Sequence, residues 1–225
     1  MAKAPRVDYP IARRASLKDV AEALGVPHTE IYGLFVDDRP AGFKHILAPG
    51  QSVDIHPATP PVDVRVPDSL HPDPLPLVRF LADANVGKLA TLLRVLGFDT
   101  AYDRHLGDRA LADLAAREQR IVLSRDIGLL KRKAIAWGHL LRSNDPQAQL
   151  REVLSLFGLT PPYQAFSRCP RCNVILTPVA KADILHRLLP KTKLYYQNFH
   201  QCPACQRIYW PGSHHEAMLK WLEKI

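Results

Sequence analysis

Three acidic side chains stand at or just after the ends of short apolar runs in the middle of the chain. The acids are Asp83, Asp103 and Asp126. Mg²⁺ and Mn²⁺ prefer carboxylate oxygens, and ions held this way activate water and neutralise charge on a phosphodiester. These residues are therefore candidates for a metal-dependent hydrolytic site. An Asp after a strand is also common as a turn former or helix N-cap, and that role is the more frequent for any one such residue taken alone.

Two further acids are reserve candidates for the same site. Asp108 is placed to N-cap a helix that follows the second apolar run, and Asp145 precedes Pro146 after a fourth run at 139–143. An Asp followed by Pro is typical of a helix start. For Asp145 we therefore keep both interpretations, a helix cap and a member of the site.

Four cysteines form two CxxC pairs separated by 29 residues. They are Cys169, Cys172, Cys202 and Cys205. Two such pairs suit one tetrahedral zinc ion, and with four protein ligands the site is closed, so the zinc is structural. The alternative, two redox dithiols, requires a thioredoxin-like pattern that this sequence lacks.

Basic residues are concentrated away from the N-terminal third of the chain. The net charge is +8, and residues 163–225 carry nine Lys/Arg against three Asp/Glu. Lys88, Arg94 and Arg125 lie near the acids in sequence and are candidates for contacts with a phosphate backbone. For each of them a solvated surface charge is the more common role.

The elements that would position these residues alternate between strand and helix. Apolar runs at 79–82, 98–103 and 121–124 predict strands, and a stripe of apolar residues over 84–96 predicts the first intervening helix, with Gly97 as its C-cap. This alternation predicts a parallel α/β sheet. Because ligands bind beyond the carboxyl ends of such strands, the acids are expected to converge there.

The N-terminal and linking segments have different patterns. Residues 1–57 predict a helix capped by Ser16, followed by strands at 31–38 and 52–57, which is the pattern of a small β-grasp module. Seven prolines lie within residues 57–76. We expect residues 58–76 to be an extended linker, either a spacer or an ordered arm packed on the next domain.

Length and composition indicate a globular protein. The chain has 225 residues, of which 47% are hydrophobic, and no apolar run is long enough to span a membrane. The N-terminus lacks the apolar core of a secretory signal, and the paired cysteines suit metal better than disulfides. We therefore expect a cytoplasmic protein.

The central and C-terminal motifs together resemble the Mut-seven-C RNase family, a branch of the PIN-like nucleases. The resemblance covers residues 78–218 and is carried by LADANVGKLATLLRVLGFDTAYD, RIVLSRDIGLLKRK, LLRSNDPQAQLREVL and SRCPRCN. It implies a PIN-like domain at 77–162, a zinc ribbon with a C-terminal helix at 163–225, and Mg- or Mn-dependent endonucleolytic RNA hydrolysis by clustered acids. Asp83 would be the first acid and Asp126 the next. Either Asp103 or Asp108 would be the middle acid, and the resemblance does not decide between them.

The N-terminal module resembles the ubiquitin-like module that is fused to these nucleases. ALGVPHTEIYGLFVDD and PGQSVDIHP carry this resemblance, and the segment before Ser16 is too short for the usual opening hairpin. Such a module implies a docking role toward a protein partner. Two alternatives to an active nuclease remain: a catalytically silent RNA- or ribosome-binding protein, and an adaptor that acts through this module. The oligomeric state is not predicted.

Overall fold

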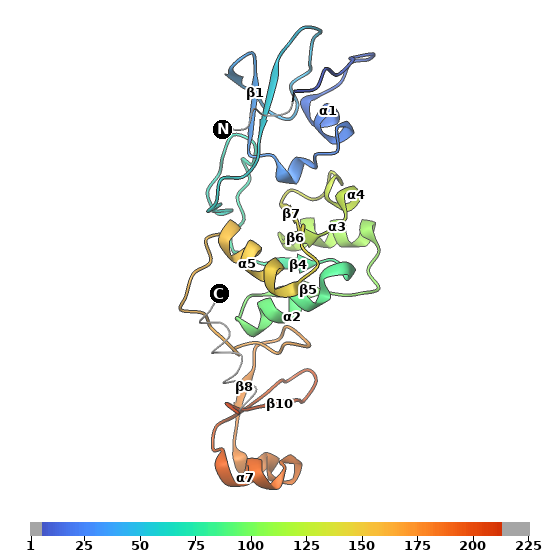
Figure 1. Cartoon of the computed structure of the whole chain (residues 1–225). Coiled ribbons are helices and arrows are strands. Elements are labelled where there is room, and N and C mark those ends of the chain that lie inside the picture. Colours follow the sequence, from blue (N-terminus) through green and yellow to red (C-terminus); the bar gives the residue numbers. More distant parts are fainter. Residues whose placement is uncertain (1–5, 213–225) are drawn as a thin grey trace.

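Three small sheets follow one another along the chain and form three parts arranged end to end (Figure 1). A computed structural model describes residues 6–212. The strand orders are β2-β1-β3 in the N-terminal part, β5-β4-β6-β7 in the centre and β10-β9-β8 in the C-terminal part. Within the described part of the chain, no helix is long and apolar enough to cross a membrane.

The central sheet is fully parallel, as the alternating pattern predicts. Its strands are β4 (Phe80–Ala82), β5 (Thr100–Tyr102), β6 (Ile121–Ser124) and β7 (Gly138–Leu140). Every residue of β4 and β6 is buried. Strands buried on both faces read as continuous apolar runs, which explains why these two were visible in the sequence.

Helices cover both faces of this sheet. They are η2 (Ala84–Val86), α2 (Gly87–Val95), α3 (Asp108–Glu118), α4 (Ile127–Leu130) and α5 (Pro146–Leu156). Helices α2 and α5 pack with Phe80 and Leu123 on one face, whereas α3 and α4 pack with Leu81 and Val122 on the other. Successive strand residues therefore fill opposite cores, as the two-residue period of a strand requires.

The N-terminal module is a small antiparallel sheet with one main helix. Its elements are α1 (Leu17–Ala23), η1 (His28–Glu30), β1 (Gly33–Val36), β2 (Arg39–Pro40) and β3 (Val53–His56). The expected capping box is present, since Ser16 and Asp19 bond reciprocally to each other's backbone. Residues 6–15 form no strand, so no opening hairpin lies among the described residues of the module.

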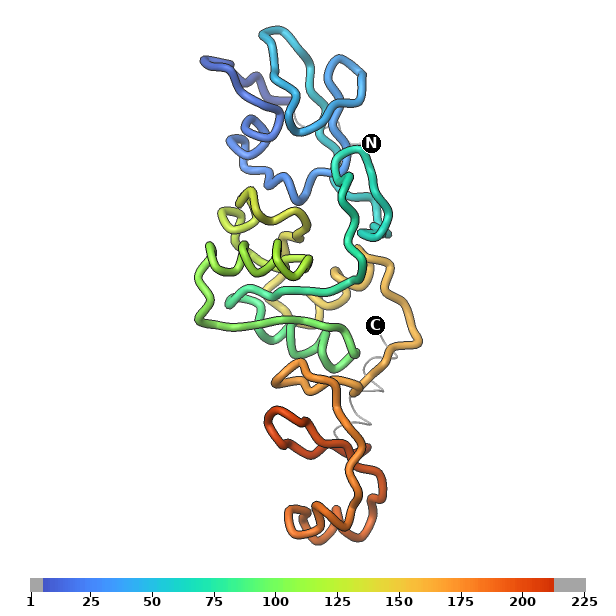
Figure 2. The backbone as a smooth tube through the Cα atoms, turned by 180° about the vertical axis from the view of Figure 1, so that it is seen from behind, coloured from blue at the N-terminus to red at the C-terminus, as the bar shows by residue number. Residues whose placement is uncertain are grey.

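The proline-rich segment is an ordered arm that contributes to two cores. Val64 and Leu75 are buried in the core beneath α2 and α5, and Leu70 is buried in the core of the module. The N–H of Leu75 donates to the carbonyl of Val64 at 2.8 Å, which folds the arm back on itself. Figure 2 shows the arm running from the module onto the central part. Of the two interpretations of this segment, the packed arm is the one seen.

The module contacts the central part through polar groups on η1 and β7. The His139 ring lies between two carboxylates, with Nδ1 3.2 Å from Glu30 Oε1 and Nε2 2.8 Å from Glu152 Oε1. Glu30 Oε1 also accepts from the backbone N–H of Leu140 at 2.8 Å. Burial acts to lower the pKa of His139, but the two carboxylates outweigh it and raise the pKa to about 9. His139 is therefore charged at neutral pH.

The C-terminal part carries three short strands and a helical insertion. Its elements are β8 (Thr177–Val179), α6 (Lys181–Ile184), η3 (Leu185–Arg187), α7 (Pro190–Tyr195), β9 (Phe199–Gln201) and β10 (Ile208–Tyr209). Phe199 is buried, and Tyr196 and Trp210 pack against it in a small core. These aromatics therefore form a small core within the C-terminal part. The predicted final helix begins at residue 213 and lies outside the described residues.

We expect His139 to stabilise the protein fully below pH 6.5, its unperturbed pKa, and to lose that contribution as the pH rises through about 9. The pKa is raised on folding, so deprotonation favours the unfolded chain. Between about pH 7 and about pH 10 the free energy of unfolding should fall by roughly 2 kcal/mol more in the wild type than in His139→Gln. Urea denaturation at both pH values measures this difference. Parallel losses in the two proteins would contradict it.

Candidate active site and zinc centre

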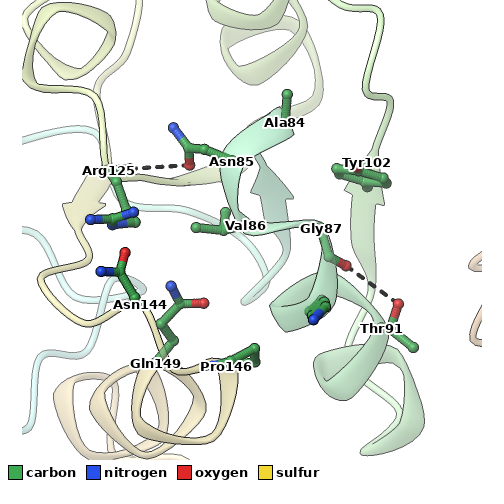
Figure 3. A pocket seen from close by; sticks show the side chains of 11 residues that line it. Ala84, Asn85, Val86, Gly87, Thr91, Tyr102, Arg125, Asn144, Pro146 and Gln149 are labelled. Atoms are coloured by element: carbon green, nitrogen blue, oxygen red, sulfur yellow. Dashed lines mark hydrogen bonds between the residues drawn. The ribbon is translucent and has the colours of Figure 1, made fainter.

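An open cleft of about 510 Å³ lies at the carboxyl ends of the central strands (Figure 3). It is lined by Ala84, Asn85, Val86, Gly87, Lys88, Thr91, Tyr102, Arg125, Asn144, Pro146 and Gln149. Most of these residues come from the segments that follow β4, β6 and β7. The cleft is therefore in the place where ligands bind to parallel sheets.

Asp83 and Asp126 are joined at this edge of the sheet by one buried hydroxyl. Ser124 Oγ donates to Asp83 Oδ2 at 2.6 Å and accepts from the backbone N–H of Asp126 at 2.9 Å. Asn85 Nδ2 donates to the same Asp83 oxygen at 2.7 Å, and Asn85 Oδ1 accepts from the N–H of Arg125 at 3.3 Å. The ends of β4 and β6 are thus fixed to each other by side chains that adjoin the cleft.

Both acids also cap short helices. Asp83 Oδ1 accepts from the N–H of Ala84 at 2.6 Å, and Asp126 Oδ1 accepts from the N–H of Gly128 at 2.7 Å and of Leu129 at 3.3 Å. The helix-cap role weighed from the sequence therefore holds for both residues. It uses one oxygen of each carboxylate for capping, and the Asp126 side chain remains exposed.

The other three candidate acids have separate local roles. Asp103 Oδ1 accepts from the N–H of His105, Asp108 forms an ion pair with Arg132 at 3.2 Å, and Asp145 Oδ2 caps α5 through the N–H of Ala148. Gly107 caps α3, and Asp108 is the first residue of that helix. Among residues 6–212, the only group of three or more His, Cys or acidic side chains arranged to hold a metal ion is the cysteine group.

The three basic candidates separate into two environments. Lys88 and Arg125 line the cleft, where both are exposed. Arg94 is only 5% exposed, and its guanidinium donates to the backbone carbonyls of Thr100, Pro170 and Arg171 at 2.8 to 3.1 Å. A buried group engaged in this way does not contact an RNA backbone. The expected role of Arg94 is thus corrected from RNA binding to holding the C-terminal part against α2 and β5.

Of the residues that line the cleft, only Lys88 and Arg125 were named from the sequence as candidates for contacts, and three of those not named as site residues are polar side chains of β5 and the β7–α5 region. Asn144 comes directly after the run at 139–143 that the sequence predicted as a strand, so its place was an available signal, although β7 itself ends at Leu140. Gln149 is 3% exposed and lies one turn into α5, where its Nε2 donates to the carbonyl of Ser143. Tyr102 packs on Gly87, because a Cβ added to that glycine would lie 2.5 Å from the ring. The last two positions follow from tertiary packing and carried no local signal.

The four cysteine sulfurs lie within 4.8 Å of one another. The two CxxC turns repeat one hydrogen-bond pattern: the N–H of Cys172 points to Cys169 Sγ at 3.4 Å, and that of Cys205 points to Cys202 Sγ at 3.5 Å. Such N–H groups stabilise thiolates, and four thiolates at this spacing suit a tetrahedral zinc ion. The described geometry therefore fits the closed structural site predicted from the spacing.

A tyrosine adds to the electrostatics of this cluster. Tyr209 Oη lies 3.1 Å from Cys169 Sγ. Burial acts to raise the pKa of the Cys169 thiol, but hydrogen bonds from Tyr209 and from backbone N–H groups lower it to about 7. Burial and the neighbouring thiols raise the pKa of Cys172 and Cys202, so in this cluster the lowered pKa belongs to Cys169 alone of these three.

Comparison with known families gives two matches. The family model described as Mut7-C RNAse domain matches residues 78–222, and the one described as Mut7-C ubiquitin matches residues 2–63. The first match contains the central sheet, the cleft and the cysteine cluster. The second contains the N-terminal module and the start of the arm. No curated protein and no solved structure matches the chain.

We expect the purified protein to hold one zinc ion per chain, and Cys202→Ser to reduce zinc binding because it removes one of four ligands. The zinc content of the two proteins, measured after dialysis against a weak chelator, tests this. Ala204→Ser, in the same turn, is the matched control and should retain the metal. Full zinc content in Cys202→Ser would contradict the four-cysteine site.

Proposed function

The chain belongs to the Mut7-C RNase family, and from this premise we propose that it is a metal-dependent endoribonuclease acting at the cleft beyond β4, β6 and β7. The observation that carries the proposal is the linkage of Asp83 and Asp126 through Ser124 beside that cleft. Two carboxylates are held close to a surface where Lys88 and Arg125 supply positive charge. This combination suits the binding and hydrolysis of a phosphodiester.

The acids fit the way in which Mg²⁺ or Mn²⁺ is commonly bound. Such an ion keeps several waters and uses one or two carboxylates together with substrate phosphates, so a preformed group of three acids is not required. Asp83 and Asp126 would hold it, with Asn85 and Ser124 fixing the Asp83 carboxylate. When bound, the ion supplies charge neutralisation and an activated water.

The cleft residues would bind and orient the RNA backbone. Lys88 and Arg125 carry charges that attract phosphate, and Gly87, the first residue of α2, lines the same cleft. The Tyr102 ring and the Asn144 amide lie on the cleft wall, where they suit contacts with a ribose or base. These residues would thus bind the RNA backbone close to Asp83 and Asp126.

The remaining three candidate acids differ in how close they lie to the cleft and in whether their carboxylates are already paired. Asp145 adjoins Asn144 and Pro146, which both line the cleft, so it is the best placed of the three. Asp103 follows Tyr102 and is exposed near the end of β5. Asp108 stays a reserve, because its carboxylate is paired with Arg132. We therefore propose Asp103 rather than Asp108 as the middle acid of the family pattern, and Asp145, which follows Asp126 in the chain, as a fourth acid.

The flanking parts would serve the nuclease in different ways. We assign zinc a structural role in the C-terminal ribbon, whose basic surface would orient RNA. The N-terminal module would dock a protein partner. Reduced cysteines, which a zinc site requires, suit the cytoplasmic location expected from the sequence.

A second candidate function is RNA binding without catalysis. It is favoured by the acids themselves, since each of the five takes part in a helix cap, a turn or an ion pair, and no three are gathered within the described residues. Such a protein would keep the basic cleft and the zinc. The two candidates differ in whether Asp83 and Asp126 are needed for turnover.

We expect Asp83→Asn and Asp126→Asn each to lower RNA cleavage by about 100-fold or more, because each removes charge that holds the metal. Cleavage of a labelled structured RNA with added Mn²⁺ or Mg²⁺ measures this. Asp113→Asn, an exposed acid of α3 outside the cleft, is the matched control and should cleave like the wild type. Tight RNA binding without cleavage by the wild type would favour the silent binding protein.

We also expect Lys88→Ala and Arg125→Ala to weaken RNA binding and its dependence on salt. Each lost contact with a single-strand phosphate should reduce the slope of log K against log salt concentration by about 0.7. Binding is measured with the Asp83→Asn protein as background, so that RNA is not consumed. Lys133→Ala, exposed and outside the cleft, should leave the slope unchanged. Equal effects from all three changes would argue against a backbone site in the cleft.

A further inference from the structure

We propose that Asn173 is a positioning residue that connects the first zinc turn to β5 and thereby holds Tyr102 in place in the cleft. The side-chain contacts that carry this inference do not involve the five candidate acids or the cysteine sulfurs. Its effect on RNA cleavage rests on the proposed function, whereas its effect on the strand does not.

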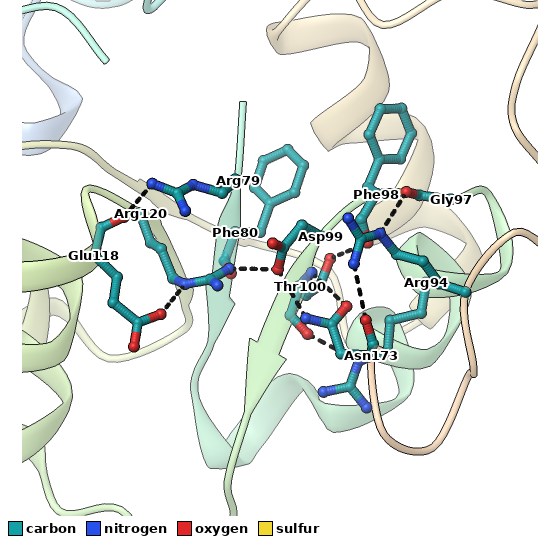
Figure 4. Close-up of polar contacts among 11 residues, drawn as sticks. Arg79, Phe80, Arg94, Gly97, Phe98, Asp99, Thr100, Glu118, Arg120 and Asn173 are labelled. Atoms are coloured by element: carbon teal, nitrogen blue, oxygen red, sulfur yellow. Dashed lines mark hydrogen bonds and ion pairs between the residues drawn. The ribbon is translucent and has the colours of Figure 1, made fainter. Parts of the chain in front are cut away.

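The outer edge of β5 is closed by side chains. Strand β5 is at the end of the sheet, and within residues 6–212 no strand pairs with its outer side. The backbone N–H of Thr100 donates to Asn173 Oδ1 at 3.0 Å, and Arg94 Nε donates to the carbonyl of Thr100 at 2.8 Å (Figure 4). The N–H and C=O groups of Thr100 that point away from the sheet thus both have hydrogen-bond partners, which an edge strand otherwise leaves open.

The other end of the Asn173 amide reaches across the sheet. Asn173 Nδ2 donates to Asp99 Oδ1 at 2.7 Å, and the same oxygen accepts from Arg120 Nη1 at 2.7 Å. Arg120 Nη1 also donates to the carbonyl of Phe80 at 3.1 Å. The Asn173 side chain is therefore connected to the backbone of β4 by three hydrogen bonds that pass through the side chains of Asp99 and Arg120.

The position of Asn173 depends on the fold of the zinc turn. Its backbone has a φ of 66°, and its N–H donates to the carbonyl of Cys169 at 2.9 Å. Asn tolerates this left-handed conformation better than most residues. With the turn fixed by its two cysteines, the amide is held toward β5 in one orientation.

The second zinc turn provides an internal comparison. Gln206 occupies the equivalent position, with a φ of 57° and an N–H that donates to the carbonyl of Cys202 at 2.8 Å. Its side chain, however, donates to the carbonyl of Pro203 within its own turn. Asn173 and Gln206 thus have the same left-handed backbone conformation and the same backbone hydrogen bond. Of the two side chains, only that of Asn173 contacts the central domain.

Strand β5 leads directly into the cleft. Tyr102 follows Thr100 by two residues, and its ring packs on Gly87 at the start of α2. Arg94, near the end of α2, donates to the carbonyls of Pro170 and Arg171 in the zinc turn. The turn therefore holds both elements that form this wall of the cleft, and loosening it at Asn173 would free β5 without removing a metal ligand.

The test compares Asn173→Gly with Gln206→Gly in the full-length, zinc-loaded protein. Glycine keeps the left-handed backbone without strain and removes only the side chain. We expect both variants to retain one zinc per chain. Hydrogen exchange at the Thr100 amide should become about tenfold faster or more in Asn173→Gly, because its acceptor is gone, and stay unchanged in Gln206→Gly. The KM for RNA should rise several-fold in Asn173→Gly, with a smaller change in kcat.

Asn173→Asp is a second disrupting variant: it replaces the Nδ2 donor with an oxygen that faces the Asp99 carboxylate, so exchange at the Thr100 amide should again be faster than in the wild type. If Asn173→Gly fails to retain zinc, the comparison of Asn173→Asp with the wild type decides in the same way. Unchanged exchange at Thr100, or equal changes in the two glycine variants, would overturn the inference. If the wild type cleaves no RNA, the proposed nuclease function fails, and hydrogen exchange alone decides whether Asn173 anchors β5.

Discussion

The edges of the central sheet are the constraint on which the rest of the structure depends. A four-stranded parallel sheet leaves one row of backbone N–H and C=O groups open on each outer strand, and buried polar groups must find partners. On β5 the partners are Asn173 and Arg94, and on β7 the N–H of Leu140 donates to Glu30. Each flanking part of the chain thus supplies a side chain that completes one edge, so the three parts are coupled through the sheet.

Hydrogen bonds to uncharged groups also fix the acids at the carboxyl ends of the strands. Ser124 is buried and bonds both Asp83 and the backbone of Asp126, so the geometry of the site is set by a residue without charge. One oxygen of each acid is used in a helix cap, which orients the carboxylate before any ligand arrives. Capping by one carboxylate oxygen therefore does not exclude a second role for the other oxygen of the same acid.

Local pattern was sufficient for elements whose determinants are close in sequence. The four parallel strands, the Pro146 start of α5 and the cysteine cluster were predicted, and each depends on buried runs, caps or short spacing. Local pattern failed where distant contacts decide. The guanidinium of Arg94 is buried by carbonyls more than 70 residues away, and Tyr102 and Gln149 reach the cleft only through packing. Of the three basic candidates chosen for their nearness to an acid in sequence, Lys88 and Arg125 line the cleft, and only Arg94 is turned away by such distant contacts.

The arm also limits how such chains can be rearranged during evolution. Leu70 completes the core of the module, whereas Val64 and Leu75 complete that of the nuclease domain. A recombination event that joined a foreign module just before residue 77 would leave holes in the nuclease core unless it also brought an arm with matching side chains. The unit that can be exchanged without loss of stability is therefore longer than the module, and gene fusions in this architecture should carry module and arm together.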